Sequence, residues 1–377
     1  MKNKSLIIFL VAVGLVWLQG CGEEDYPVPP ASTVPKFSVS IDNNEFAPAT
    51  VSFTNESIVP ERAGNVTYLW NFGDGTSSQE TSPVHLYETP GVYEVKLVVL
   101  TESSLEMNES TQSIVIKDPN ASGIPLFFTN GSTVFTALIN DQPPVVISTA
   151  ITSLQSSYGM VVDTANDLLY VADLSGKKIL VSNLDGSGLR DFRVDIGDVS
   201  TVAIDYEDNM LYWDTADGIR RANLDDDDVS QYEDFVTGQS NDPEGVAIDP
   251  VNRTLYWNNY EGGVWMKNLD GTNEKSIAGG DGGGSVLVIG DRLYFDEYIQ
   301  AGDIHIKSAN LDGTGVSTIV TGVSRLMYGL VYDEEGDKIY WVDRNNNRIM
   351  RANPDGSAVE PWVTGMSMRG LAIGKKK

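Results

Sequence analysis

The side chains that carry most nucleophilic and metal chemistry are scarce in this chain. Its 377 residues include one cysteine, Cys21, and two histidines, His85 and His305. A single thiol cannot form an internal disulfide, and it cannot supply a zinc site that needs several thiolates. Two histidines provide few imidazole groups that could act as a general acid or base. The composition therefore predicts a protein that is not an enzyme and that holds no metal and no cofactor.

The other candidates for ligand chemistry are aromatic and charged residues that lie between strand-like segments. Tyrosine faces beside carboxylates and amides suit the recognition of a sugar or a peptide. The candidate ligand-binding residues are Tyr158, Glu244, Tyr260, Tyr298, Arg325, Tyr328 and Arg369. They are far apart in the sequence, so the fold must bring them together.

A repeated segment supplies the elements that could position them. Its copies are Leu169–Asp173, Leu211–Thr215, Leu255–Asn259, Leu293–Glu297 and Ile339–Asp343, with Leu126–Asn130 as a degenerate first copy. The tyrosines of successive full copies are 38 to 46 residues apart. Each copy contains four short runs with alternating apolar positions, which predict strands, and its length is typical of a propeller blade. Residues 124–373 are therefore predicted to form a six-bladed β-propeller.

The order of the runs predicts how the ring closes. The first copy lacks its first run, and the last copy is followed by a spare one, Gly370–Ile373. We expect this C-terminal strand to complete the first blade, which leaves few exposed strand edges. The expected fold class is all-β.

The repeat region resembles the YWTD propeller that is built from LDL-receptor class B repeats. Trp213, Trp257 and Trp341 stand where that motif has its tryptophan. The Thr-Asp half of the motif is kept poorly, and one cysteine cannot supply the cysteine-rich modules that flank the animal receptors. The resemblance implies the fold, and it implies that the motif residues pack between blades. It also implies a ligand at one mouth of the central channel, on the loops before each inner strand and after each second strand.

Six-bladed propellers also include calcium-dependent lactonases, so a hydrolase of that kind is one alternative. Its metal requires Glu244, Asn258 and Asp296 to converge on the channel. A histidine-dependent lyase is a poor alternative, because His305 is the one propeller histidine and falls in a predicted strand. The glycine-rich segment 279–284 resembles a calcium-binding repeat but occurs once, so we expect a flexible loop there. A purely structural or adhesive protein is the last alternative, and it predicts no concave aromatic pocket.

Residues 36–118 contain short alternating runs separated by turn residues, as in a small antiparallel β-sandwich. At the centre is a Trp-Asn-Phe-Gly-Asp-Gly segment that begins at Trp70. This segment resembles the hallmark of the PKD domain, an Ig-like sandwich. Trp70 and Phe72 should point into the core, Asp74 should bond its own turn, and His85 should be a satisfied sandwich histidine. The resemblance implies a spacer or adhesive module of extracellular proteins.

The first 35 residues are typical of an exported lipoprotein. A basic start precedes an apolar stretch that is too short to span a bilayer with ease, as in a signal peptide over residues 1–20. Leu18–Cys21 resembles the bacterial lipobox, although Gln19 replaces the usual small residue. Cys21 is the predicted lipidation site, and proline-rich residues 21–35 are the predicted tether. The acidic residues after the cysteine resemble a surface-export signal, so we expect a lipid-anchored protein of the outer membrane that faces the cell surface.

The charge of the chain limits its partners. A net charge of −27 argues against nucleic acid, because contact with phosphate requires a lysine and arginine footprint. It favours a well solvated monomer. We therefore expect a non-catalytic cell-envelope lipoprotein that contacts the membrane through its lipid and whose propeller binds a glycan or a protein. A role as an accessory to outer-membrane nutrient uptake is an analogy.

Overall fold

The computed structural model describes residues 32–102, 105–119, 122–139, 145, 147–280, 282–326 and 328–376. The predicted signal peptide, Cys21 and most of the predicted tether lie outside these residues. The chain divides into two compact units, one drawn mainly from residues before Val115 and the other mainly from Val115 onward. Among the described residues, no helix is both long enough and apolar enough to cross a membrane.

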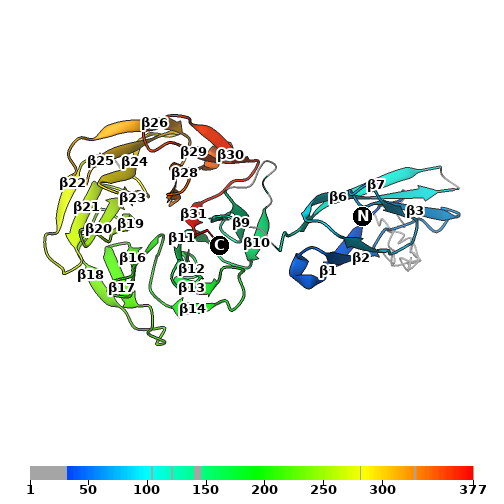
Figure 1. Ribbon diagram of the computed structural model, residues 1–377, viewed down its shortest axis with the longest axis horizontal. Helices are drawn as coiled ribbons and strands as arrows, with labels where there is room; N and C mark the ends of the chain where they lie inside the picture. Colours follow the sequence, from blue (N-terminus) through cyan, green and yellow to red (C-terminus); the bar gives the residue numbers. More distant parts are fainter. Residues whose placement is uncertain are drawn as a thin grey trace, which may run out of the picture. The chain divides into compact units, whose positions relative to one another are not determined.

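The first unit is a sandwich of two sheets with the strand orders β1-β2-β5 and β4-β3-β6-β7 (Figure 1). The strands are β1 (Phe37–Ile41), β2 (Ala49–Asn55), β3 (Val66–Asn71), β4 (Ser77–Ser78), β5 (Val84–Tyr87), β6 (Gly91–Thr101) and β7 (Met107–Ile116), with one 3₁₀ turn, η1 (Asn43–Glu45). Val34 forms an isolated β-bridge with Ile58, and Thr33 is buried. The last residues of the predicted tether therefore belong to the sandwich.

The aromatic segment singled out in the sequence forms the centre of this unit. Trp70 is buried, and its indole N–H donates to the Glu80 carbonyl at 2.9 Å. The rings of Phe72 and His85 stack with centroids 4.2 Å apart, and His85 Nε2 lies 2.6 Å from Asp74 Oδ2. Asp74 Oδ1 also accepts the backbone N–H two residues later at 2.9 Å. The structural roles predicted for these side chains are confirmed.

The second unit is a six-bladed β-propeller, so the predicted all-β fold class is confirmed (Figure 1). The first blade contains β8 (Pro125–Thr129), β9 (Val134–Leu138), β10 (Ser148–Ile151) and β31 (Gly370–Ile373). The second contains β11 (Ser157–Asp163), β12 (Leu168–Asp173), β13 (Lys178–Asn183) and β14 (Arg190–Arg193), and the third contains β15 (Val202–Asp205), β16 (Met210–Thr215), β17 (Gly218–Asn223) and β18 (Glu233–Val236).

The other three blades repeat this order from the inner to the outer edge. The fourth contains β19 (Pro243–Asp249), β20 (Thr254–Asn259), β21 (Gly263–Asn268) and β22 (Lys275–Ala278). The fifth contains β23 (Val286–Ile289), β24 (Arg292–Gln300), β25 (Asp303–Asn310) and β26 (Ser317–Val323). The sixth contains β27 (Leu330–Asp333), β28 (Lys338–Asp343), the 3₁₀ turn η2 (Arg344–Asn346), β29 (Arg348–Ala352) and β30 (Glu360–Thr364).

The C-terminal strand closes the ring, as predicted. β31 pairs antiparallel with β8 and so becomes the inner strand of the first blade; it is the red strand beside β9 in Figure 1. The inner strands contact one another in the closed sequence β31, β11, β15, β19, β23, β27 and again β31. The first blade is therefore built from both ends of the propeller sequence, which removes the open edge that an unclosed blade would present.

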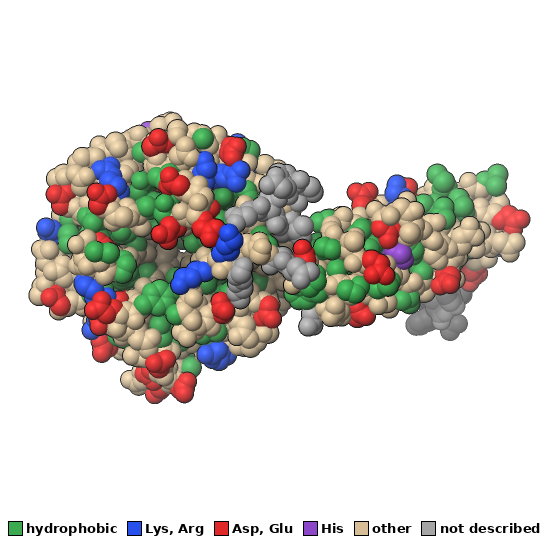
Figure 2. Space-filling model, viewed as in Figure 1, with side chains coloured by type: hydrophobic (Ala, Val, Ile, Leu, Met, Phe, Trp, Pro, Cys, Tyr) green, Lys and Arg blue, Asp and Glu red, His purple; other side chains and the backbone are tan. Residues whose placement is uncertain are grey.

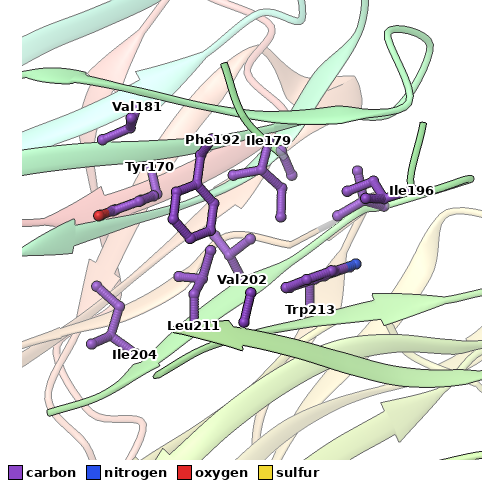
Figure 3. Close-up of a cluster of buried hydrophobic side chains, with 12 residues drawn as sticks. Tyr170, Ile179, Val181, Phe192, Ile196, Val202, Ile204, Leu211 and Trp213 are labelled. Carbon is purple, nitrogen blue, oxygen red and sulfur yellow. The ribbon is translucent and has the colours of Figure 1, made fainter. Parts of the chain in front are cut away.

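Alternation along each second strand explains the repeated pair of aromatic residues. Neighbouring residues of a strand point to opposite faces of the sheet, so one packs toward the next blade and the other toward the previous blade. In Figure 3, Tyr170 of β12 and Trp213 of β16 belong to one buried cluster between two blades. The same pairing recurs as Tyr212 with Trp257, Tyr256 with Phe295, Tyr294 with Trp341, Tyr340 with Phe128, and Phe127 with Val171. The motif aromatics form the cores between blades, as predicted.

Aspartates of four second strands, β12, β16, β24 and β28, fix the loops that lead into the inner strands. Each aspartate carboxylate accepts a hydrogen bond from the backbone N–H of a serine. The pairs are Asp173 with Ser156 at 2.7 Å, Asp214 with Ser200 at 3.1 Å, Asp296 with Ser285 at 2.7 Å, and Asp343 with Ser324 at 2.9 Å. Each of these carboxylates is buried. The loops that carry the candidate ligand-binding residues are thus held by hydrogen bonds to the blades.

Candidate ligand-binding site

All seven predicted residues lie at the same end of the propeller, where inner strands begin and second strands end. They form two groups that meet at Glu244. Four of them, Glu244, Tyr260, Tyr298 and Arg325, line a pocket of about 300 Å³. The other three, Tyr158, Tyr328 and Arg369, are clustered at the mouth of the central channel. The fold therefore brings together residues that the sequence spreads over five blades.

The pocket combines exposed aromatic rings with buried apolar side chains and a few polar groups. Tyr260 is 59% exposed and Tyr298 is 46% exposed. Ile304 and Leu326 also line the pocket and are buried. Polar side chains come from Glu244, Arg325, Ser324 and Asn345. A concave apolar surface with a small number of polar groups is the usual composition of a small-molecule site.

Gly282, Gly283 and Gly284 form a packed wall of this pocket, so the expected flexible loop does not extend over the second half of the glycine-rich segment. A Cβ built on Gly282 would overlap the carbonyl oxygen of Tyr260, and one on Gly283 would overlap the carbonyl oxygen of Asp296. The Gly282 carbonyl also accepts the N–H of Tyr298 at 3.0 Å. These positions require glycine because backbone from neighbouring elements approaches them closely.

We expect Gly283→Ala to lower the free energy of unfolding by about 1–3 kcal/mol, the range typical of an overpacked position. The added methyl group would meet the backbone of Asp296 and the amide of Asn258, both of which lie on central strands. Thermal denaturation of the full chain measures the effect. Gly279→Ala is the matched control, because its Cβ would have nothing within 4 Å. Equal melting temperatures for the two variants would contradict a packed wall.

Tyr328 lines the channel and not the pocket. Its side chain is buried, and its backbone φ of 51° lies in the left-handed region. Its ring meets the Tyr158 ring edge-on, with centroids 5.2 Å apart. Its hydroxyl hydrogen-bonds with Glu244 and Ser200, and a Cβ on Gly284 would lie 3.0 Å from its ring. Tyr328 is therefore placed to position Glu244, and it presents no exposed ring to a ligand in the pocket.

The channel itself is lined mainly by apolar residues. Figure 2 shows the propeller hollowed at its centre, and the cavity there has a volume of about 260 Å³. Its lining includes Met160, Val202, Val246, Val286, Leu330 and Leu371, which come from the inner strands. The polar candidates lie at the mouth, so a polar ligand finds partners beside the channel axis and not along it.

Two carboxyl groups that line the pocket hold protons more tightly than usual. Burial raises the pKa of Glu244 to about 7; Asp242 adds to the rise, whereas Tyr328 and Arg325 oppose it. Burial also raises the pKa of Asp296 to about 7, although the N–H groups of Ser285 and Gly284 oppose the rise. Near neutral pH, Glu244 can therefore both donate and accept hydrogen bonds.

The sequence reasoning missed Arg344 and Asn345. Both lie in the loop after β28, which was predicted to face the ligand, but neither was singled out. Asn345 lines the pocket, and Arg344 hydrogen-bonds with Tyr158. A signal was available, because Arg344 directly follows Asp343, the aspartate that ends β28, and Asn345 is the next residue.

Two of the three residues considered for calcium, Asn258 and Asp296, form hydrogen bonds that hold the fold. Asn258 Nδ2 donates to the carbonyls of Ser285 at 3.1 Å and Asp296 at 3.0 Å. The amide thus turns its nitrogen, and not its oxygen, toward Asp296, whereas calcium takes oxygen ligands. In the part of the chain that the structure describes, no three His, Cys, Asp or Glu residues are grouped so that they could hold a metal ion. Of the three residues, Asn258 therefore offers calcium no oxygen ligand beside Asp296.

Comparison with known proteins separates the two units. Residues 33–116 match the family model of the PKD domain. Collagenase ColA of Bacillus cereus is 39% identical over 72 residues, which are 19% of this chain and 8% of that protein. Protein cueball of Drosophila grimshawi is 25% identical over 254 residues, which are 66% of this chain and 34% of that protein. The chain thus spans about a third or less of the length of these curated relatives.

Solved structures share the propeller fold. A chain in the crystal structure of a nidogen/laminin complex has a TM-score of 0.58 at 17% identity, over 67% of this chain and 98% of that chain. TolB from Acinetobacter baumannii has a TM-score of 0.53 at 10% identity, over 75% of this chain and 80% of that chain. These likenesses concern the fold alone. The chain therefore joins a PKD domain to a propeller of the kind found in these two structures.

Proposed function

We propose that the propeller is a non-catalytic binding module for a ligand outside the cell, and that this ligand is a saccharide. The observation that carries the proposal is the pair of exposed rings, Tyr260 and Tyr298, at a pocket of about 300 Å³. This volume is at the lower end of small-molecule sites. A protein partner, the other ligand class, typically needs roughly 800 Å² of surface on each side.

The polar groups of the pocket support the same ligand class. Glu244, Ser324, Asn345 and Arg325 offer a carboxyl, a hydroxyl, an amide and a guanidinium over a small area. Hydroxyl groups of a sugar can pair with such donors and acceptors while the apolar face of its ring lies on a tyrosine. No nucleophile is needed for this role.

We further propose that the module is carried by a lipoprotein of the outer membrane, where it faces the cell surface as an accessory to nutrient uptake. Cys21 within a lipobox-like segment supports lipidation, and the acidic residues that follow it support surface export. The PKD domain between this segment and the propeller fits a spacer role.

We expect Tyr260→Ala and Tyr298→Ala each to weaken saccharide binding about tenfold or more, because removal of an aromatic contact residue costs at least ~1–2 kcal/mol at a binding hot spot. A screen of the full chain against an oligosaccharide array identifies the ligand, and titration calorimetry then compares the variants. Both rings are exposed, so the variants should melt at the temperature of the unaltered protein.

Tyr206→Ala is the matched control for these two variants. Tyr206 is 49% exposed and follows β15 at the opposite end of that strand from the pocket. Loss of binding in this control equal to that in the pocket variants would contradict the assignment of the pocket. Absence of any saccharide ligand would overturn the proposed function.

A further inference from the structure

Three arginines from different loops lie together at the mouth. Arg325 precedes β27, Arg344 begins η2, and Arg369 precedes β31. The backbone N–H of Arg344 donates to the carbonyl of Arg325 at 3.1 Å, and the N–H of Arg369 donates to Thr129 at 2.7 Å. The loops that carry these side chains are therefore tied to each other or to the blades.

Tyr158 connects two of these guanidinium groups. Arg344 hydrogen-bonds with this tyrosine, and the Cζ atom of Arg369 lies 4.9 Å from the centre of its ring. Arg369 Nη1 also donates to the Ser156 hydroxyl at 2.8 Å. Gly131, whose φ of 108° favours glycine, leaves room for this guanidinium group, because a Cβ there would lie 2.7 Å from the Arg369 guanidinium carbon. The guanidinium group of Arg369 is thus held in a defined place.

This cluster continues into the pocket. Arg325 lines the pocket itself, and Asn345, which follows Arg344 in the chain, is also part of the lining. Burial lowers the pKa of Arg344, and the positive charges of Arg369 and Arg325 lower it further. Like charges are therefore held close together here, in a chain whose net charge is −27. An anion placed among them would relieve their repulsion.

The loops before β15 and β19 and after β20 form an acidic side of the mouth. Burial raises the pKa of Asp242, and the nearby carboxylates Glu261 and Asp198 raise it further. Glu244 is close to both this acidic side and the arginines, since the charges of Asp242 and Arg325 both act on its pKa. A ligand with many negative charges would be repelled by the acidic side, whereas a ligand with one charge can be oriented by the two sides.

We propose that the saccharide bound in the pocket contains a uronic acid, and that its single carboxylate docks on Arg325 and Arg344 beside Arg369. The inference rests on the proposed function and adds the chemical class of the sugar. Arginine pairs with a carboxylate through parallel N–H donors. The tyrosines of the pocket then contact the sugar ring that carries the acid or the ring next to it.

The test is a titration of the full chain with oligosaccharides of galacturonate, glucuronate and mannuronate and with their neutral methyl esters. We expect at least one of the acids to bind, and to bind about tenfold or more tightly than its ester, since a charge-assisted hydrogen bond contributes about 1.5–3 kcal/mol. The affinity for the acid should fall as salt is added, whereas that for the ester should not. Arg325→Gln should reduce the affinity for the acid to that for the ester.

Arg190→Gln is the matched control, because Arg190 is exposed on the outer strand β14 and carries the same charge. It should leave both affinities unchanged. Equal affinity for acid and ester, with loss of both in Tyr260→Ala, would overturn the uronate while the proposed function stands. No binding of any saccharide would overturn both. If an acidic tripeptide binds with the same dependence on Arg325 and no saccharide binds, the uronate proposal is overturned and the ligand is a peptide.

Discussion

A chain that ends at Arg369 is expected to lose the cooperative unfolding transition of its propeller, whereas a chain that ends at Gly374 should keep it. The first truncation removes β31, which pairs with β8 from Gly370↔Thr129 to Ile373↔Leu126. Without this strand, β8 becomes an open edge in the middle of the ring. The inner strands β11 and β27 lose their shared neighbour at the same time.

The energetic loss is comparable to the stability of a domain. Leu371 is buried in the core between the sixth and first blades, and truncation of such a side chain alone costs about 2–5 kcal/mol. The lost ladder hydrogen bonds add about 1 kcal/mol each. Phe127 and Phe128, both buried next to β31, would gain access to water. A whole domain is typically stable by only about 5–15 kcal/mol.

Calorimetric scans of the two truncated chains check this prediction. The PKD domain supplies an internal reference, because Trp70 and its neighbours form a core of their own and should unfold as before. The chain that ends at Gly374 loses the tail but keeps β31, so it controls for removal of the C-terminal residues. A normal propeller transition in the chain that ends at Arg369 would show that β31 is not needed to close the ring.

The ring could be predicted from the sequence because its determinants are local. A Tyr-Trp pair on one strand necessarily points to two faces, and its repetition at blade length leaves few arrangements other than a ring of interblade cores. The position of β31 followed from a count of strand-like runs at the two ends. The buried Trp213 and Tyr170 (Figure 3) confirm that the alternation was interpreted correctly.

The pocket could be predicted only in part, because its walls depend on contacts between blades. Tyr260 lies after β20, as expected, whereas Tyr298 lies within the last residues of β24, at the same end of the propeller. Gly282 gave no such signal, because a glycine in a packed wall and a glycine in a loose loop look the same in one sequence. Tyr328 lies at the mouth, but its burial against Tyr158 depends on the fold and could not be predicted from the residue type.

Glu244→Gln is expected to stabilise the propeller at pH 8 and to leave its stability almost unchanged near pH 4.5. The pKa of Glu244 is raised from an ordinary 4.5 to about 7 in the folded state, chiefly by burial. Between these two values the folded protein binds a proton that the unfolded chain has released. Stability therefore decreases as the pH rises from 4.5 to 7, and this group causes no further loss above that range.

The size of the effect follows from the shift. One pKa unit corresponds to about 1.4 kcal/mol, and partial solvent contact of Glu244 reduces the full value, so we expect a gain on the order of 2 kcal/mol at pH 8. For a domain of this size, that gain raises the melting temperature by roughly 4–8 °C. Glutamine keeps an oxygen that can accept the Tyr328 hydroxyl, so the substitution removes the charge and preserves the hydrogen bond.

Melting temperatures measured from pH 4.5 to pH 8 for the unaltered chain and for Glu244→Gln test this pH dependence. Glu334→Gln removes one negative charge from an exposed turn at the other end of the propeller. It controls for the general decrease in charge repulsion when a chain with net charge −27 loses one carboxylate. The curves of this control and of the unaltered chain should run parallel. The Glu244→Gln curve should lie flatter, with its gap from the unaltered chain opening between pH 5 and 7. If that gap is constant across the range, Glu244 titrates as an ordinary surface carboxylate, and its place between Tyr328 and the arginines of the mouth does not bury it.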